Sequence, residues 1–192
     1  MNIFDLLTKE EKEKCQRIVC EKERIIFRED EKCEHLGIVI KGLVNITSYS
    51  LNGREIVYNS LSNGQMFGNN LLYSSNPYYK GNVISSSNSE IILLDKNTLI
   101  EVLKNNESFL LAFLKYNSDF SKSLNYQIKL LSFDSAEERL LYYLKDKRKV
   151  HIKSVSSLAK SLFLTREATS RLLSKMVEEG KIRRSGNIIE LL

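Results

Sequence analysis

The residues best suited to specific polar recognition lie on one exposed face of a predicted helix that begins near Thr165. At helical spacing, starting in the first turn, this face carries Thr165, Arg166, Glu167, Ser170, Arg171 and Lys175. An arginine can donate two hydrogen bonds to O6 and N7 of guanine, and a glutamate can accept one from N4 of cytosine. Threonine, serine and lysine suit phosphate oxygens, which position a helix without reading sequence. The face therefore predicts a helix that reads base edges in the major groove of double-stranded DNA.

Two helices joined by a short turn would position these side chains. Ser154 can cap a first helix, Phe163 and Leu164 form the turn, and Thr165 can cap the second helix, which runs to about Glu179. The small Ala159 allows the second helix to approach the first closely. The opposite face of the second helix is apolar and is predicted to enter the core, with Leu172, Leu173, Met176 and Val177.

A basic hairpin is predicted after the second helix. Residues 181–191 follow Gly180, and the turn is expected at Ser185-Gly186-Asn187. Such a hairpin would form a wing, with Arg183 and Arg184 beside the DNA backbone. The alternative is an amphipathic helix with ordinary surface charges, but two apolar faces, a turn and a basic hairpin in this order favour DNA binding.

The charge distribution supports a separate polyanion-binding module. Residues 1–133 contain 16 lysines and arginines and 16 aspartates and glutamates, whereas residues 134–192 contain 13 and 8. The last third therefore carries the whole formal charge of +5. A neutral module joined to a basic one is the pattern expected of a nucleic-acid-binding protein.

The first hundred residues are typical of a small β domain. After a helix predicted from about Thr8 to Cys20, short segments rich in β-branched residues alternate with glycines and with Asn-Gly or Asn-Pro pairs. The predicted strands lie within residues 24–27, 36–40, 43–47, 55–58, 81–84 and 90–94. This spacing favours an antiparallel barrel or jelly roll over residues 1–106.

A long helix is predicted over residues 107–133, with two apolar stripes. One stripe contains Leu110, Leu114, Leu124, Ile128 and Leu131, and an adjoining one contains Phe109, Phe113, Tyr116 and Phe120. One small barrel cannot cover both stripes, so we expect one stripe to pack on the barrel and the other on a partner chain in a homodimer. Full burial of the helix within one subunit is the alternative. A capping box at Ser135 and Glu138 then opens the DNA-binding domain, residues 134–192, in which residues 145–149 are expected to form a solvated loop.

Metal, redox and membrane functions find little support in the sequence. The three cysteines, Cys15, Cys20 and Cys33, form no close pair and are expected to be buried structural thiols, although a redox or cluster role is the alternative. With only His35 and His151, a metal enzyme built on a β-barrel is disfavoured, and no metal or cofactor is predicted. No run approaches a membrane span, and the N-terminus lacks the pattern of a signal peptide, so we expect a cytoplasmic protein.

Together these segments resemble the Crp/Fnr family of bacterial transcription regulators over nearly the whole chain. The most specific stretch is residues 164–173, which is similar to the family's recognition helix; residues 27–30, 38–42, 63–68 and 180–182 support it. The resemblance implies an α+β fold: an N-terminal double-stranded β-helix, or jelly-roll barrel, then a dimerisation helix and a winged helix-turn-helix. It also implies a homodimer that binds an inverted-repeat operator and contacts RNA polymerase. The regulator either responds to a small-molecule effector of unknown identity or acts constitutively.

The chain departs from the family in two places. Phe163 stands where the family usually has glycine, so we expect either strain or an adjusted turn. By the resemblance, the effector pocket would contain Gly68, Asn69, Asn70, Tyr79, Lys80 and Asn125, and Asn69, Tyr79 and Lys80 replace the Glu, Arg and Ser that hold cyclic AMP. A phosphodiester would lose its bidentate arginine there, so loss of cyclic-AMP binding is predicted. A cyclic-nucleotide-binding regulatory module is the alternative function.

Overall fold

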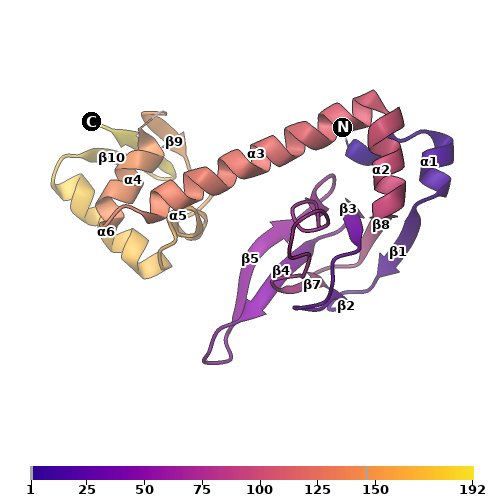
Figure 1. Ribbon diagram of the computed structural model, residues 1–192. Coiled ribbons are helices and arrows are strands. Elements are labelled where there is room, and N and C mark those ends of the chain that lie inside the picture. Colours follow the sequence, from indigo (N-terminus) through magenta and orange to yellow (C-terminus); the bar gives the residue numbers. More distant parts are fainter. Residues whose placement is uncertain (1, 146) are drawn as a thin grey trace. The chain divides into compact units, whose positions relative to one another are not determined.

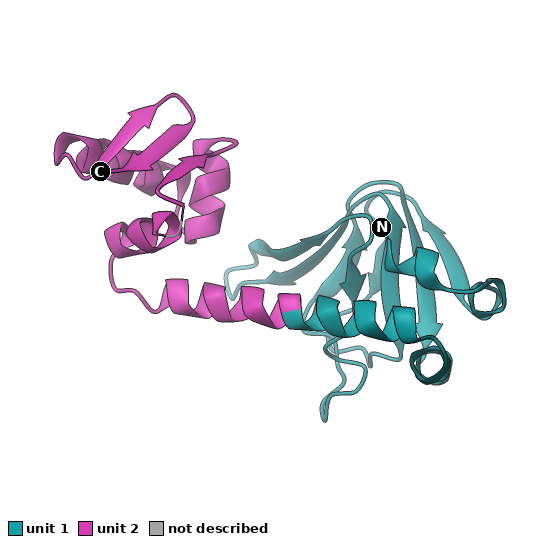
Figure 2. Cartoon of the chain, turned by 90° about the horizontal axis from the view of Figure 1, so that it is seen from above, with its two compact units in different colours: residues 1–118 teal, residues 119–192 magenta. Residues whose placement is uncertain are grey.

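The computed structural model describes residues 2–145 and 147–192. The chain divides into two compact units, Met1–Ser118 and Asp119–Leu192, and the border lies inside one long helix (Figure 2). The sequence-based limits at residues 106 and 133, which set this helix apart as a segment of its own, stay a prediction. Within the described residues, no helix combines the length and the apolar character that crossing a bilayer requires.

The first unit contains a β-barrel of two four-stranded antiparallel sheets, as predicted (Figure 1). One sheet has the order β1-β8-β3-β6, and the other has the order β2-β7-β4-β5. In chain order the strands are β1 (Gln16–Cys20), β2 (Ile25–Phe27), β3 (His35–Lys41), β4 (Val44–Tyr49), β5 (Glu55–Leu61), β6 (Met66–Phe67), β7 (Asn82–Ser85) and β8 (Ser89–Asp95).

Close packing between β3 and β6 shapes the interior of the barrel. Gly37 on β3 pairs with Phe67 on β6, and a Cβ atom at position 37 would lie 2.0 Å from Cζ of the Phe67 ring. Only glycine leaves room for the ring there. The core around this contact is aliphatic and includes Leu36, Ile38, Val83, Ile91 and Leu94, all fully buried.

The N-terminal helix is shorter than the sequence predicted. A 3₁₀-helix, η1 (Ile3–Leu6), precedes α1 (Lys9–Glu13), and residues 16–20 form β1 instead of continuing the helix to Cys20. The prediction was wrong there because Ile18, Val19 and Cys20 pair in register with Ile91, Glu90 and Ser89 of β8, and this pairing outweighs helical spacing.

Two helices follow the barrel strands. Asp95 caps α2 (Lys96–Asn105) by accepting hydrogen bonds from the backbone N–H groups of Asn97 and Thr98. The long helix α3 (Glu107–Leu131) ends two residues before the predicted limit. Phe109 is fully buried, and Phe113 and Tyr116 pack beside it on the barrel core, which confirms that one apolar stripe faces the barrel.

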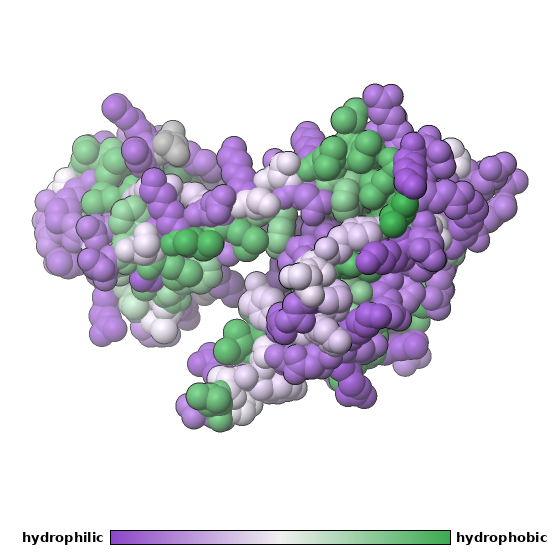
Figure 3. All heavy atoms as spheres, in the orientation of Figure 1, coloured by the Kyte–Doolittle hydropathy of each residue, from purple (hydrophilic) through white to green (hydrophobic). Residues whose placement is uncertain are grey.

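Most of the other stripe of α3 is exposed, although Leu110 is partly buried. Leu114, Leu124, Ile128 and Leu131 are exposed, and Ile128 keeps 65% of its surface accessible. In the space-filling view, hydrophobic side chains gather towards both ends of α3, with hydrophilic ones between them (Figure 3). The helix thus has the uncovered apolar surface that the dimer prediction requires.

The second unit is a winged helix-turn-helix. Its helices are α4 (Ala136–Leu144), α5 (Val155–Leu162) and α6 (Arg166–Glu178). A three-stranded antiparallel sheet in the order β10-β11-β9 contains β9 (Lys149–His151), β10 (Ile182–Ser185) and β11 (Ile188–Leu191). Ser135 and Glu138 form the predicted capping box. Lys149 lies in β9 and not in the predicted loop, because Val150 is buried in this unit's core. Asp146 of that loop lies outside the described residues.

Candidate nucleic-acid interface and effector pocket

The turn between α5 and α6 is built on a left-handed residue. Phe163 has φ 56° and ψ 43°, so its backbone takes the conformation that glycine takes in such turns. The N–H groups of Phe163 and Leu164 donate to carbonyls in the last turn of α5. The turn therefore keeps the backbone geometry usual for glycine, and the backbone of Phe163 is strained. Phe163 is 46% exposed.

Helix α6 presents polar side chains outward over an apolar back face. The Thr165 hydroxyl accepts a hydrogen bond from the backbone N–H of Ala168 over 3.1 Å and caps the helix as predicted. The outward residues Arg166, Glu167, Ser170 and Arg171 are all exposed. Thr169, Leu172, Leu173 and Met176 are buried beneath them. The spacing of apolar residues did not predict the burial of Thr169, whose hydroxyl donates a hydrogen bond to the carbonyl oxygen of Thr165 over 2.9 Å.

Val177 does not enter the core as expected, since it is 42% exposed. It lies in the last turn of α6, where it lines an open groove of about 480 Å³ with Ser174, Glu178, Arg184 and Gly186. Met176 and Leu173 already fill the core at this level, so Val177 faces the side of the wing instead.

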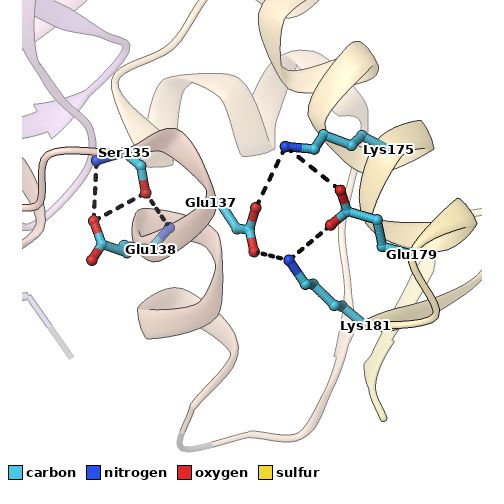
Figure 4. A network of polar contacts seen from close by, with 6 residues as sticks. All are labelled: Ser135, Glu137, Glu138, Lys175, Glu179 and Lys181. Atoms are coloured by element: carbon cyan, nitrogen blue, oxygen red, sulfur yellow. Dashed lines mark hydrogen bonds and ion pairs between the residues drawn. The ribbon is translucent and has the colours of Figure 1, made fainter.

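Lys175 belongs to a network of four alternating charges (Figure 4). Its amine lies 3.9 Å from Oε2 of Glu137 and 3.6 Å from Oε1 of Glu179. Lys181 bonds the other oxygen of Glu137 and lies 2.7 Å from Oε2 of Glu179. The hydrogen bond with Glu137 raises the pKa of Lys181, and the hydrogen bond from Lys181 lowers the pKa of Glu179. The sequence singled out only Lys175 of this set, although its spacing to Glu179 could have revealed one pair.

The wing is the predicted hairpin. Ser185 pairs with Ile188, so the turn falls at Gly186 and Asn187, and Gly186 has φ 57°. Arg183 lies 3.8 Å from Glu190 on the neighbouring strand, whereas Arg184 donates from Nε to the carbonyl of Gly186 over 3.2 Å. Both guanidinium groups stay on the surface.

The effector-pocket residues of the first unit lie on the segment after β6. Gly68 has φ 76°, and a Cβ there would lie 2.5 Å from the carbonyl oxygen of His35. The Asn69 amide donates to Oδ1 of Asn117 on α3 over 2.9 Å, and Asn70 is exposed. Asn125 belongs to the second unit and is also exposed, so its part in a pocket stays a prediction.

Tyr79 and Lys80 point to different environments. Tyr79 is 3% exposed, and its ring stacks on Phe27. Its hydroxyl lies beside the Cys33 thiol, but among the described residues it has no partner with hydrogen-bond geometry, and burial raises its pKa. Lys80 is exposed, and its amine lies 4.0 Å from Asp30. The buried position thus holds a neutral phenol, and the nearest cation in sequence lies at the surface.

Cys20 and Cys33 are buried, as expected of structural thiols, and Cys15 is partly buried. Burial raises the pKa of all three thiols, that of Cys15 to about 11. Their thiolate forms are therefore scarce at neutral pH, which disfavours reactive-cysteine chemistry.

Comparisons with known proteins agree with this architecture. Residues 17–106 match the family model of the cyclic nucleotide-binding domain. Over 183 residues the chain is 24% identical to the Anaerobic regulatory protein of Bacillus subtilis (strain 168), with 88% of this chain and 77% of that protein covered.

Solved structures are similar over almost the whole chain. The Catabolite Activator Protein of Thermus thermophilus matches with a TM-score of 0.59 at 22% identity, covering 99% of this chain and 93% of that one. A mutant of CooA from Carboxydothermus hydrogenoformans matches with a TM-score of 0.70 at 18% identity, covering 100% and 91%. At these identities the likeness is one of fold.

Proposed function

The chain has the fold of the Crp/Fnr regulators, with a cyclic nucleotide-binding domain at residues 17–106, and from this premise we propose that it is a sequence-specific DNA-binding transcription regulator. It acts as a homodimer on an inverted-repeat operator and is not an enzyme. A regulator of this kind works on chromosomal DNA together with RNA polymerase, so the cytoplasm is its expected compartment.

The observation that carries this proposal is the outward face of α6. Arg166, Glu167 and Arg171 are exposed together at the start of a helix whose back face is buried and whose N-terminus is capped by Thr165. Directional donors and an acceptor in the first turns of such a helix can pair with base edges in the major groove. Ser170 and the wing residues Arg183 and Arg184 are suited to the flanking phosphates.

The proposal of a homodimer rests on α3. Its exposed residues Leu114, Leu124, Ile128 and Leu131 recur at helical spacing over nearly five turns. Several large apolar side chains exposed on one helix mark an interaction site. A second copy of α3 offers a stripe of the same length and chemistry, and two-fold symmetry then matches an operator of two opposed half-sites.

We further propose that the barrel no longer binds cyclic AMP in the manner of the family. The position that the resemblance assigns to an arginine holds the buried phenol of Tyr79, and the amide of Asn69 is engaged by Asn117. Neither residue offers a positive charge to a phosphodiester, whose burial without a partner costs several kcal/mol. The alternative function is a cyclic-nucleotide-binding regulatory module. The observation in its favour is the match of residues 17–106 to the cyclic nucleotide-binding domain.

The test of the proposed function is selection of duplexes from a random pool by the full-length protein, followed by fluorescence anisotropy on the selected sequence. We expect an inverted repeat that binds at least 10³-fold more tightly than unrelated DNA, as is usual for specific regulators. Equal affinity for both duplexes would reject sequence-specific regulation. Calorimetric titration with cyclic AMP and cyclic GMP separates the two readings of the barrel.

A further inference from the structure

The exposed stripe of α6 that carries Glu167 and Arg171 continues to Lys175. Residues four apart lie on the same side of a helix, about 6 Å apart along its axis. Lys175 is thus the next side chain after Arg171 on the face proposed to meet DNA, and it is the natural candidate for a phosphate contact. Its amine, however, lies between Glu137 and Glu179.

Glu137 is the member of this network that comes from another helix. It lies in the first turn of α4, and its two oxygens face Lys175 and Lys181, while Glu179 faces the same two amines from the end of α6 (Figure 4). The side chains of Glu137 and Glu179 are 24% and 35% exposed, whereas those of Lys175 and Lys181 are 61% and 44% exposed. Solvent and salt therefore screen the network in part, which makes its strength dependent on salt concentration. The two positive and two negative charges cancel.

We propose that Glu137 limits the sequence-independent affinity for DNA by holding Lys175 and Lys181 away from the phosphates. The inference rests on the proposed DNA-binding function and adds a residue that acts against binding. A lysine that contacts phosphate raises affinity for every sequence, because the backbone is the same everywhere and the gain comes from release of counterions. Lysines already neutralised by carboxylates must give up those partners before they can contribute.

The competing explanation is that the network only ties α4 to the end of α6 and the start of β10. If the network has only this stabilising role, its loss lowers the free energy of unfolding and leaves the number of phosphate contacts unchanged. Release of withheld lysines raises that number. The slope of log affinity against log salt concentration reports the number of contacts, so it separates the two explanations.

The experiment compares Glu137→Gln with a matched control, Glu178→Gln. Both remove one negative charge from the same region, but among the described residues Glu178 forms no ion pair. Full-length proteins are titrated by anisotropy onto a duplex of unrelated sequence at salt concentrations from about 50 to 200 mM, a range over which phosphate contacts are readily counted.

We expect Glu137→Gln to bind more tightly at low salt, with a slope steeper by about 0.9 for each lysine released. The double variant Glu137→Gln with Lys175→Gln should lose part of that increase, and Glu178→Gln should keep the original slope. If Glu137→Gln does not fold, Glu179→Gln releases the same amines from the other side. Equal slopes for the glutamine variants and the control would overturn the inference. If the unmodified protein bound no DNA at any salt concentration, the proposed function would fail, and this inference would fail with it.

Discussion

The ring of Tyr79 lies on the ring of Phe27, with 5.0 Å between the centroids and 15° between the planes. The stack forms where the resemblance to cyclic-AMP-binding regulators would place a guanidinium. A stacked aromatic pair contributes about 0.5–1.5 kcal/mol beyond its buried area. The aromatic stack at this position therefore stabilises the barrel.

Cyclic nucleotides should leave the thermal stability of the protein unchanged. A ligand that binds only the folded state raises the melting temperature by mass action, and millimolar cyclic AMP or cyclic GMP would do so if the barrel bound either. Differential scanning fluorimetry over a range of concentrations measures this. A dose-dependent rise would show that the barrel recognises the nucleotide without an arginine.

The Tyr79→Phe variant should be more stable than the unmodified protein by about 1 kcal/mol, because it keeps the stacked ring and removes a buried hydroxyl that has no hydrogen-bond partner within residues 2–145 and 147–192. Tyr79→Leu serves as the control, since it removes both groups and should be destabilising. Urea unfolding gives the free energies. A loss of stability in Tyr79→Phe would mean that the hydroxyl is satisfied, with Cys33 as the nearest candidate.

Dimerisation should depend on the outward stripe of α3. Replacing Leu124 and Ile128 together by glutamate places charges on the exposed apolar surface and should yield monomers. The control, Ser118→Glu with Lys122→Gln, changes the net charge by the same amount at exposed polar positions away from this stripe and should stay dimeric. Sedimentation velocity at micromolar concentration distinguishes the species. A monomeric unmodified protein would contradict the assignment of α3.

Sequence discrimination should depend on Glu167 and Arg171. By resemblance to family members with the same residues at these positions, each half-site should contain a core similar to TGTGA. Replacing either residue by alanine should cost roughly 1–3 kcal/mol of discrimination at one base pair, because a directional contact to a base edge is lost. Anisotropy on single-base variants of the selected operator measures the loss. An Arg171→Ala protein with unaltered preference would show that α6 does not read the bases.

The left-handed turn at Phe163 predicts an unusual ranking of two variants. Phe163→Gly should be more stable than Phe163→Ala by about 1–2 kcal/mol, because both lose the ring but only alanine keeps a Cβ at φ 56°. Thermal unfolding of the two variants gives the difference. The reverse order would mean that the turn relaxes when the aromatic ring is absent.

Local patterns predicted the elements of the second unit well. Ser154 and Thr165 cap their helices because a hydroxyl accepts the free N–H groups of the first turn, and such a signal is complete within four residues. The first unit was harder, since β1 and β6 exist through pairing with β8 and β3, strands distant in sequence. The residue pattern before Cys20 resembles a helix and contains no sign of the pairing between β1 and β8.

In the candidate site too, local features could be predicted from the sequence and long-range contacts could not. The outward face of α6 follows from spacing alone, and the structure confirms that its residues are exposed. The carboxylate of Glu137 beside Lys175 could not be foreseen, because the two residues are 38 positions apart and meet only when α4 packs near α6. Val177 was misplaced for a related reason, since the hairpin decides which side of the last turn stays open.

The contact between Gly37 and Phe67 makes two positions of the barrel share one volume. Since a methyl group at 37 and a benzyl group at 67 cannot coexist on these backbones, the two positions should covary among natural variants. Alanine or serine at 37 would be accompanied by a smaller side chain at 67, whereas glycine would accompany an aromatic one. A substitution at only one of these two positions creates a steric clash or a cavity. Substitutions at 37 and 67 should therefore be rare and should occur together.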